Sequence, residues 1–179
     1  MKKETTVCFS GYRPEKMPFT PDTPGFSAFL EKQKEITDRL YEVGFRTFVT
    51  GGARGFDTWV AQDVLHLRRR HGDVCLHLAL AFPGQEQEWN EEDRRLYRQI
   101  MEEADTVTYC SPRYERGVYY TRNRFMVDSS SFLVAAYDGA KGGTAYTVSY
   151  AMRQTVPVVC LRPKTLRVEY VGTARLASF

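Results

Sequence analysis

Short apolar stretches alternate along the chain with longer stretches in which apolar residues recur every three to four positions. The short stretches are rich in β-branched and aromatic residues and indicate strands, whereas the longer period is that of amphipathic helices. Strands are predicted over residues 6–10, 46–50, 74–81, 106–109, 132–137 and 155–161. Helices are predicted between them, over residues 24–43, 56–70, 89–104, 120–129 and 143–153.

This alternation of strands and helices predicts the fold class. In successive βαβ units the strands run parallel and the helices cover both faces of the sheet. We therefore expect an α/β protein, a Rossmann-like three-layer sandwich with a mostly parallel sheet. Pro157 suggests either an edge position or the start of a strand for the last segment. The chain beyond it is ambiguous, so we expect one domain over 1–165 and a tail, 166–179, whose order the sequence leaves open.

Composition and charge are those of an ordinary globular domain. The 179 residues are 42% hydrophobic and 26% charged, with a net charge of +3, which argues against both disorder and a second domain. Basic residues are dispersed except for Arg68, Arg69 and Arg70, which suit a solvated helix end, and this disfavours nucleic acid as a partner. The sequence has no signal-peptide core and no apolar stretch that could span a bilayer, so we expect a cytoplasmic protein without membrane contact.

The cysteine and histidine residues indicate neither a disulfide framework nor a metal site. Cys8, Cys75, Cys110 and Cys160 lie in or beside predicted strands, and no two of them form a C-x-x-C pair. We interpret them as buried free thiols. The three histidines have no ligand spacing with cysteines or carboxylates. We expect no metal and no cofactor, and the sequence leaves open whether the chain forms a homo-oligomer.

Candidate chemistry gathers in three glycine-bearing loops, each of which follows a predicted strand. In a parallel sheet the carboxyl ends of the strands face one crevice, where helix N-termini favour anionic ligands. Glycine lets main-chain N–H groups approach a phosphate without interference from a Cβ atom, although tight turns also require it. The loops supply Gly11 after the first strand, Gly51, Gly52 and Gly55 after the second, and Gly142, Gly143 and Thr144 after the fifth.

Five motifs occur in order along the chain. They are Gly11-Tyr12-Arg13-Pro14, Gly51-Gly52-Ala53-x-Gly55-x-Asp57, Phe82-Pro83-Gly84-Gln85-Glu86 with Trp89, Arg122-Asn123-Arg124-x-Met126-Val127-Asp128, and Asp138-Gly139 followed by Gly142-Gly143-Thr144. Together they resemble the YpsA-like family of the SLOG superfamily, which also includes the LOG-type phosphoribohydrolases and the DNA-processing DprA proteins of bacteria. The resemblance covers about residues 5–161. It implies a Rossmann-like domain that binds a nucleotide or a nucleotide-derived ligand, with the glycine–threonine loop at the phosphate.

Arginine, asparagine and tyrosine side chains are candidate ligand contacts. Arg13 and Arg124 are suited to bidentate recognition of a phosphate or carboxylate, with an ordinary ion pair as the alternative. Asn123 is suited to a base edge or a ribose hydroxyl, or to a local capping or turn hydrogen bond. Tyr119 and Tyr120 are suited either to stacking on a base or to ordinary packing.

Two carboxylates are the catalytic candidates. Asp57 lies in the first turn of a predicted helix and Asp138 at the end of a predicted strand. Either could accept from a ribose hydroxyl or act as a general base, and the alternatives are a favourable interaction with the helix dipole and a turn hydrogen bond. We interpret Trp89 as a core anchor rather than a stacking platform. Gln85 and Glu86 follow the third strand and are expected to face the same crevice.

The motifs favour a nucleotide-binding sensor or regulatory protein, because phosphate-type loops converge without a recognisable catalytic constellation. The rival is a nucleoside 5′-monophosphate phosphoribohydrolase of the LOG type, which hydrolyses the N-glycosidic bond. In LOG proteins a glutamate follows the glycine–threonine loop, whereas residues 145–148 contain no acid here. Catalysis is therefore left open. Single-stranded DNA binding of the DprA kind lacks the basic surface that it requires.

Overall fold

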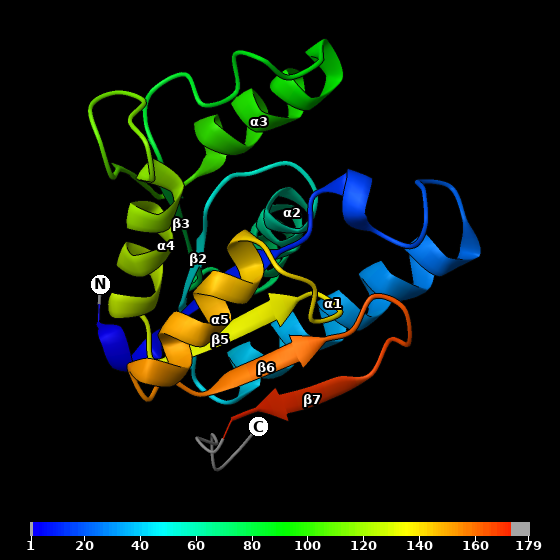
Figure 1. Cartoon of the computed structure of the whole chain (residues 1–179). Coiled ribbons are helices and arrows are strands. Elements are labelled where there is room, and N and C mark those ends of the chain that lie inside the picture. Colours follow the sequence, from blue (N-terminus) through cyan, green and yellow to red (C-terminus); the bar gives the residue numbers. More distant parts are fainter. Residues whose placement is uncertain (1, 173–179) are drawn as a thin grey trace.

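The computed structural model describes residues 2–172, which form a seven-stranded sheet with helices on both faces (Figure 1). The strand order is β4-β3-β2-β1-β5-β6-β7. All neighbouring strands are parallel except β6 and β7. The strands are β1 (Thr6–Gly11), β2 (Thr47–Thr50), β3 (Cys75–Leu80), β4 (Thr106–Tyr109), β5 (Phe132–Ala136), β6 (Val158–Leu161) and β7 (Val168–Val171). The helices are α1 (Pro24–Glu42), α2 (Phe56–His71), α3 (Glu91–Glu103), α4 (Val118–Asp128) and α5 (Gly143–Arg153).

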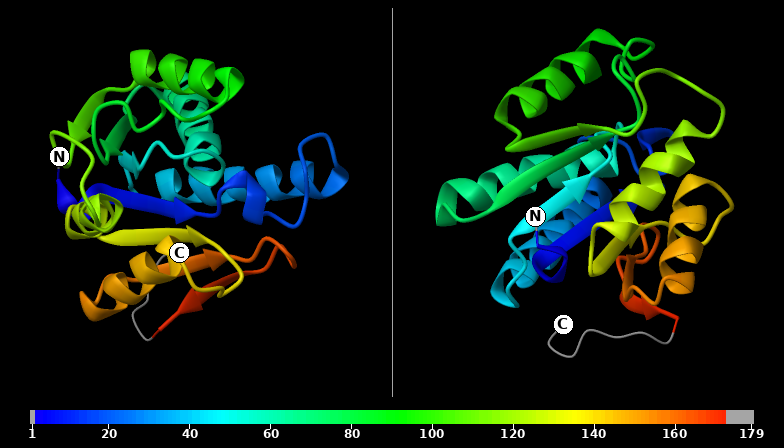
Figure 2. Two further views of the ribbon diagram at one scale, coloured as in Figure 1. Left: turned by 45° about the horizontal axis from the view of Figure 1, so that its top comes forward. Right: turned by 90° about the vertical axis from the view of Figure 1, so that its left-hand side faces the viewer.

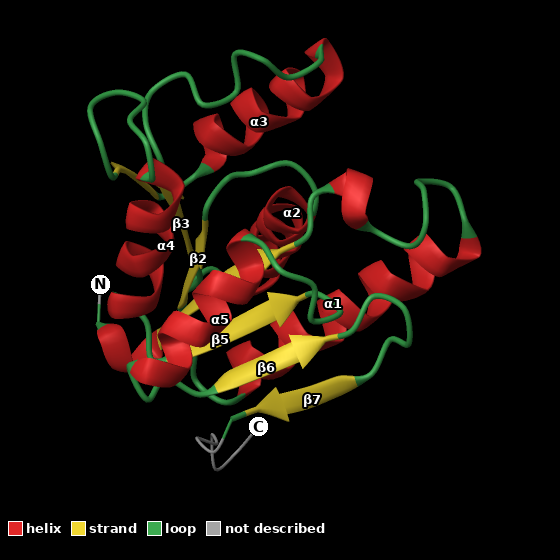
Figure 3. Cartoon of the chain, in the orientation of Figure 1, coloured by secondary structure: helices red, strands yellow, loops and turns green. Residues whose placement is uncertain are grey.

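The sheet separates two hydrophobic cores. Along β1, Val7 and Phe9 enter one core and Cys8 enters the other, as the alternation of side chains along a strand requires. The first core is covered by α1 and α2, with α3 packed on α2, and the second by α4 and α5. The right-hand view of Figure 2 and the colours of Figure 3 show these layers. The predicted α/β class, a Rossmann-like three-layer sandwich with a mostly parallel sheet, is confirmed.

The helices differ in how their N-termini are capped. The hydroxyl of Thr23 accepts from the amide of Phe26 at the start of α1 (3.3 Å), and the side chain of Asn90 accepts from the amide of Asp93 at the start of α3 (2.9 Å). The other three helices have no side-chain cap, and their N-cap residues are Gly55, Gly117 and Gly142. A side-chain cap satisfies main-chain N–H groups that otherwise need a partner. These three helices therefore depend on neighbouring loops, water or a ligand to satisfy their first amides.

Helix α3 begins two residues later than predicted. The side chain of Asn90 forms the cap, so the helix starts at Glu91 and Trp89 lies in the preceding loop. The ring of Trp89 still packs edge-on against Tyr97, with the ring centres 5.4 Å apart, and it borders the first core. Its interpretation as a packing residue agrees with this contact.

The C-terminal part of the sheet differs from the prediction. Of the two alternatives for Pro157, the strand start agrees with the structure, because Pro157 directly precedes β6, whereas β6 lies between β5 and β7 and is not an edge strand. The sequence predicts no strand beyond 161, yet β7 pairs with β6 after a tight turn in which the amide of Arg162 donates to the carbonyl of Arg167 (2.8 Å). Only four residues, Val-Glu-Tyr-Val, form β7, and so short a segment shows too little alternation to predict a strand. Part of the 166–179 tail thus belongs to the sheet, and residues 173–179 lie outside the described part of the chain.

The cysteines are free thiols at two levels of burial. Cys8 and Cys160 are buried, and burial raises the pKa of each thiol to about 12. Cys75 and Cys110 are only half-buried, so the expectation of four buried thiols is correct for two. Over residues 2–172, none of the helices combines the length and apolar character needed to cross a bilayer.

Candidate functional site

A cleft of about 310 Å³ opens where β1 and β5 end and where α2, α4 and α5 begin. From β1 the chain adds strands in one direction to β4, and from β5 it adds them in the other direction, so the cleft lies at the topological switch point of the sheet. Seven of the predicted ligand residues line it: Gly11, Arg13, Asp57, Asn123, Gly142, Gly143 and Thr144. The cleft walls also include Lys16, Ala53, Tyr119, Tyr120, Arg122 and Lys141.

The paired glycines after β2 face the protein rather than the cleft. The carbonyl of Gly51 accepts from the guanidinium of Arg122, and the side-chain amide of Gln85 donates to the carbonyls of Gly51 and Gly52, each at 3.2 Å. A Cβ atom at Gly52 would lie 2.7 Å from the side chain of Leu80. Gly51 and Gly52, predicted as ligand-binding residues, are therefore buried packing positions, because neighbouring side chains occupy the space that a phosphate would need.

Gly55 is also a packing position. It has φ +86°, and a Cβ atom there would lie 2.8 Å from both Pro14 and the carbonyl oxygen of Tyr12. The amide of Phe56 donates to that carbonyl (3.2 Å), so the first turn of α2 rests on the loop after β1. Gly55 thus does not line the cleft, and the loop after β2 contributes Ala53 instead.

Asp57 and Arg122 form a buried ion pair at the base of the cleft. The carboxylate of Asp57 lies 3.9 Å from the guanidinium of Arg122, and their side chains are 8% and 7% exposed. The carboxylate also accepts from the amide of Ala53 (3.3 Å). Burial raises the pKa of Asp57 and the charge of Arg122 counteracts it, while burial lowers the pKa of Arg122. The guanidinium of Arg122 therefore favours the charged form of the buried Asp57 carboxyl.

Asn123 belongs to a hydrogen-bond chain that joins α4 to α5. Its side-chain oxygen accepts from Nε of Arg122 (2.8 Å), and its side-chain nitrogen donates to the hydroxyl of Thr147 (2.8 Å). That hydroxyl donates in turn to the carbonyl of Gly143 (2.9 Å). The amide of Asn123 is thus largely committed within the protein and fixes the side chain of Arg122.

Three further cations line the cleft near its mouth. Arg13, Lys16 and Lys141 are exposed, and within residues 2–172 none of them has a carboxylate at ion-pair distance. The guanidinium carbons of Arg13 and Arg122 both lie 6.0 Å from the ring centre of Tyr119. Because Asp57 is matched by Arg122, the cleft as a whole is electropositive and suited to an anion.

The N-terminus of α5 opens into this electropositive cleft. Its N-cap, Gly142, has φ +150°, and a Cβ atom there would lie 3.3 Å from Nζ of Lys16. A Cβ atom at Gly143 would meet nothing within 4 Å. No side chain caps the helix, and its first turn holds no acid. These are the conditions under which main-chain N–H groups and the helix dipole receive an anion.

Two further predicted site residues, Asp138 and Arg124, lie outside the cleft. The carboxylate of Asp138 accepts from the amide of Lys164 (3.3 Å) while its own amide donates to the hydroxyl of Tyr12 (3.1 Å), so Asp138 is a turn residue. Arg124 is exposed and its guanidinium donates to the hydroxyl of Thr121 (3.4 Å). Since residues two positions apart on a helix face different sides, Arg122 enters the cleft and Arg124 does not.

A family model described as the YspA SLOG family matches residues 7–163. The chain belongs to the YspA SLOG family. Its relatives include the UPF0398 protein of Bacillus pumilus (strain SAFR-032), 29% identical over 169 residues that make up 91% of this chain and 90% of the relative. The UPF0398 protein of Bacillus thuringiensis (strain Al Hakam) is 28% identical over 152 residues, 83% of each chain. The resemblance on the five motifs is confirmed.

This member of the YspA SLOG family also shares its fold with solved DprA structures. DNA processing protein A of Streptococcus pneumoniae superposes with a TM-score of 0.59 at 17% identity, covering 88% of this chain and 50% of the other. The same protein of Helicobacter pylori, whose structure concerns single-stranded DNA binding, gives a TM-score of 0.57 at 13% identity, covering 88% and 65%. This chain therefore spans one half to two thirds of those proteins, and the likeness is one of fold.

Sequence reasoning in this YspA SLOG chain missed Arg122 as a site residue. The signal was available in the helical period, since Tyr119, Arg122, Asn123 and Met126 are spaced to share one face and all line the cleft. Gln85, expected to face the crevice, is buried and holds the loop after β2 instead. Tyr119 and Tyr120 do line the cleft.

Proposed function

We propose that this protein binds a nucleotide or a nucleotide derivative and acts as a sensor or regulatory protein. The observation that carries the proposal is the uncapped N-terminus of α5. It opens into the same cleft as three cations that have no carboxylate partner among the described residues 2–172. A phosphate group fits Gly142, Gly143 and Thr144 because main-chain N–H groups, the hydroxyl of Thr144 and the helix dipole all favour negative charge there. Lys16 and Lys141 add charge at the same point.

The part of the cleft formed by Tyr119 and Tyr120 suits the base and ribose. The rings of Tyr119 and Tyr120 present apolar faces, and aromatic side chains stack on nucleobases of any kind. The guanidinium groups of Arg13 and Arg122 flank Tyr119 and keep that part of the cleft positively charged. A cleft of about 310 Å³ lies at the small end of the range for small-molecule sites, which runs from about 300 to 1,000 Å³. The size is consistent with a mononucleotide.

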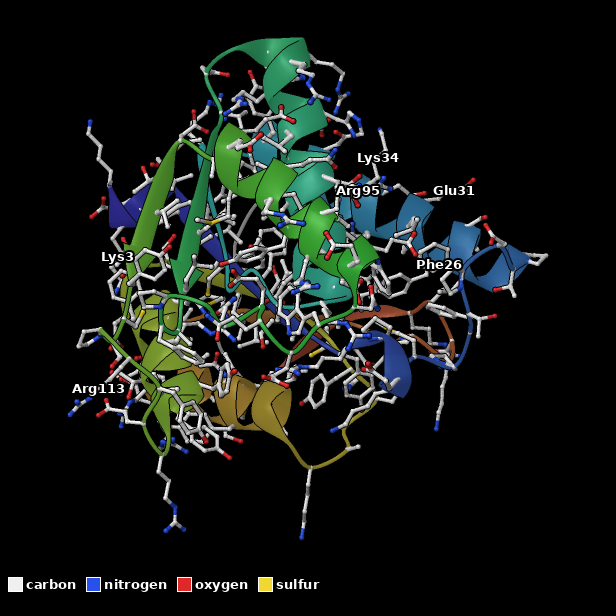
Figure 4. All side chains as sticks on the ribbon, turned by 90° about the horizontal axis from the view of Figure 1, so that it is seen from above. Lys3, Phe26, Glu31, Lys34, Arg95 and Arg113 are labelled. Carbon is white, nitrogen blue, oxygen red and sulfur yellow. The ribbon has the colours of Figure 1, made fainter. Side chains whose placement is uncertain are left out.

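Isothermal titration calorimetry against a panel of nucleoside monophosphates, cyclic nucleotides and ADP-ribose derivatives tests this function. We expect saturable binding of at least one compound with a stoichiometry of one, and a weaker affinity at high salt because the cleft is charged. Replacement of Thr144 by valine is expected to weaken binding, since the shape is kept while the hydroxyl is lost. Arg95→Ala, at an exposed position on α3, is the matched control (Figure 4). A folded protein that binds nothing in the panel contradicts the proposal.

One observation favours hydrolysis of the N-glycosidic bond as a second candidate. Asp57 lines the cleft, and burial raises the pKa of its carboxyl, as suits a group that activates water or stabilises a developing oxocarbenium ion. Water would add to C1′ of the ribose, and the base would leave with a proton. Asp138 has no such position. Incubation with nucleoside monophosphates should release free base, and Asp57→Asn should abolish release while binding persists; no release by the wild type excludes this candidate.

A further inference from the structure

A row of three tyrosines leads away from the cleft along α4 and α5. It consists of Tyr120, Tyr146 and Tyr150, which we call the tyrosine ladder. The ring centres of Tyr120 and Tyr146 are 4.5 Å apart, and those of Tyr146 and Tyr150 are 6.4 Å apart with only 11° between the ring planes. The two helices lie side by side on one face of the sheet (Figures 1 and 2). Because Tyr120 also lines the cleft, the ladder begins where the cleft ends.

The ladder remains accessible from solvent. Tyr120 is 47% exposed, and Tyr146 and Tyr150 are half-buried. The hydroxyl of Tyr150 donates to the carboxylate of Asp128, with distances of 2.9 and 3.1 Å to its two oxygens. Tyr146 and Tyr150 lie four positions apart on α5, and such a pair stabilises a helix modestly. Helix stabilisation does not explain the third ring, Tyr120, which comes from α4 and lies at the rim of the cleft. A fixed row of accessible rings is the arrangement on which successive bases stack.

Positive charge accompanies the ladder. The guanidinium carbon of Arg153 lies 5.7 Å from the ring centre of Tyr150, and Arg124 is close enough to act on the same phenol electrostatically. Neither arginine has an ion-pair partner in the part of the chain that the structure describes. Asp128 is the one acid in α4 and α5, and it is engaged by Tyr150. The strip thus combines aromatic rings with net positive charge, which complements a base joined to a phosphate.

We propose that the tyrosine ladder is a second base-binding subsite, so that the ligand of this protein is a dinucleotide with one nucleotide in the cleft and the next base on Tyr146 and Tyr150. The inference rests on the proposed nucleotide binding in the cleft. It also gives Arg124 and Arg153 a role outside the cleft, since both add positive charge beside Tyr150.

A comparison of 5′-phosphorylated dinucleotides with the matching mononucleotides tests the subsite. We expect at least one of the four homodinucleotides, such as pApA, to bind about tenfold or more tightly than its mononucleotide, such as AMP, because each stacked base contributes about that much. Tyr150→Leu is expected to remove this advantage and to leave mononucleotide affinity unchanged. Tyr150→Phe, which keeps the ring and loses the bond to Asp128, is expected to retain it. Thermal unfolding verifies that both variants are folded.

The outcomes separate this inference from the function on which it rests. If no mononucleotide and no dinucleotide binds the folded protein, nucleotide binding in the cleft is wrong and the subsite falls with it. If mononucleotides bind but dinucleotides have no advantage, or if Tyr150→Leu keeps the advantage, the subsite alone is wrong. Sedimentation of the same variants tests whether the ladder instead binds a second copy of the chain. If the wild type is a dimer, and Tyr150→Leu dissociates it without changing dinucleotide affinity, the ladder is a dimer interface and the proposal is wrong.

Discussion

Two glycine-rich loops with similar sequences, residues 50–57 after β2 and residues 138–144 after β5, are built in opposite ways. In the first, buried carbonyl oxygens of Gly51 and Gly52 hold the side chains of Arg122 and Gln85. In the second, exposed glycines leave the start of α5 open to the cleft. A glycine-rich loop at a strand end can therefore make room for the protein's own side chains or for a ligand, and the glycine pattern alone does not separate the two.

The largest expected effect on stability is that of Arg122→Met, which removes the side chain that the loop after β2 holds. The variant leaves the carboxylate of Asp57 buried without its counter-charge, which costs about 3–5 kcal/mol of unfolding free energy. Urea unfolding followed by circular dichroism measures the loss. Adding Asp57→Asn to the variant removes the unpaired charge and is expected to recover part of the stability. A double variant that is no more stable than Arg122→Met would show that the pair does not carry this energy.

The next effect comes from Gly51→Ala. The added Cβ would overlap the guanidinium of Arg122 and lie 2.8 Å from the carboxylate of Asp57, so the buried pair must shift. Overpacking of this kind costs about 1–3 kcal/mol, measured by the same urea titration. Gly44→Ala is not a useful control because Gly44 has φ +104°. Unchanged stability in Gly51→Ala would mean that Arg122 can leave its position on the loop freely.

The stability deficit of Arg122→Met is expected to depend on pH. Burial raises the pKa of Asp57, and Arg122 is the strongest influence that lowers it, so the folded-state pKa rises further in the variant. The unfolded carboxyl titrates near its ordinary value of about 3.9. Because the folded-state pKa is raised above the unfolded-state pKa, the free energy of unfolding of the variant is greatest below the unfolded-state pKa. It decreases as the pH rises through the folded-state pKa. Urea unfolding of the wild type and of Arg122→Met at about pH 4 and about pH 7 measures how the stability deficit changes with pH. Equal deficits at the two pH values would contradict this prediction.

A smaller effect, on ligand affinity alone, is expected for Arg13→Ala. Arg13 is exposed at the cleft and has no carboxylate partner among residues 2–172, so its removal leaves stability unchanged. Losing one charge-assisted contact is expected to weaken the affinity for a bound nucleotide about tenfold, as measured by calorimetry. Arg95→Ala on α3 removes the same charge from an exposed residue that does not line the cleft and serves as the control. Equal effects of the two variants would indicate a general charge effect rather than a contact.

The sequence predicted the layers of the fold, because strand–helix alternation indicates a parallel sheet. It also indicated the edge of the sheet at which the cleft lies, because all strand-end loops share that edge. It could not predict which atoms of a loop face the ligand. Both loops contain a pair of glycines just before a helix, but only the folded protein brings Arg122, 71 positions away, onto the carbonyl of Gly51. Helix phase separates Arg122, which enters the cleft, from Arg124, which does not. The four residues of β7 are too few to show the period of a strand.

The smallest effect on stability, and the sharpest comparison with Gly51→Ala, is expected for Gly143→Ala. Gly143 begins α5, its φ lies outside the left-handed region, and an added Cβ meets nothing within 4 Å. Alanine also has a higher helix propensity than glycine, so we expect a change within about 0.5 kcal/mol or a slight gain. If the open loop receives a phosphate, the methyl group lies where that group must approach, and nucleotide affinity should fall although stability does not. Gly143→Ala with full stability and unchanged affinity would mean that both glycine loops serve only the protein's own packing and turns.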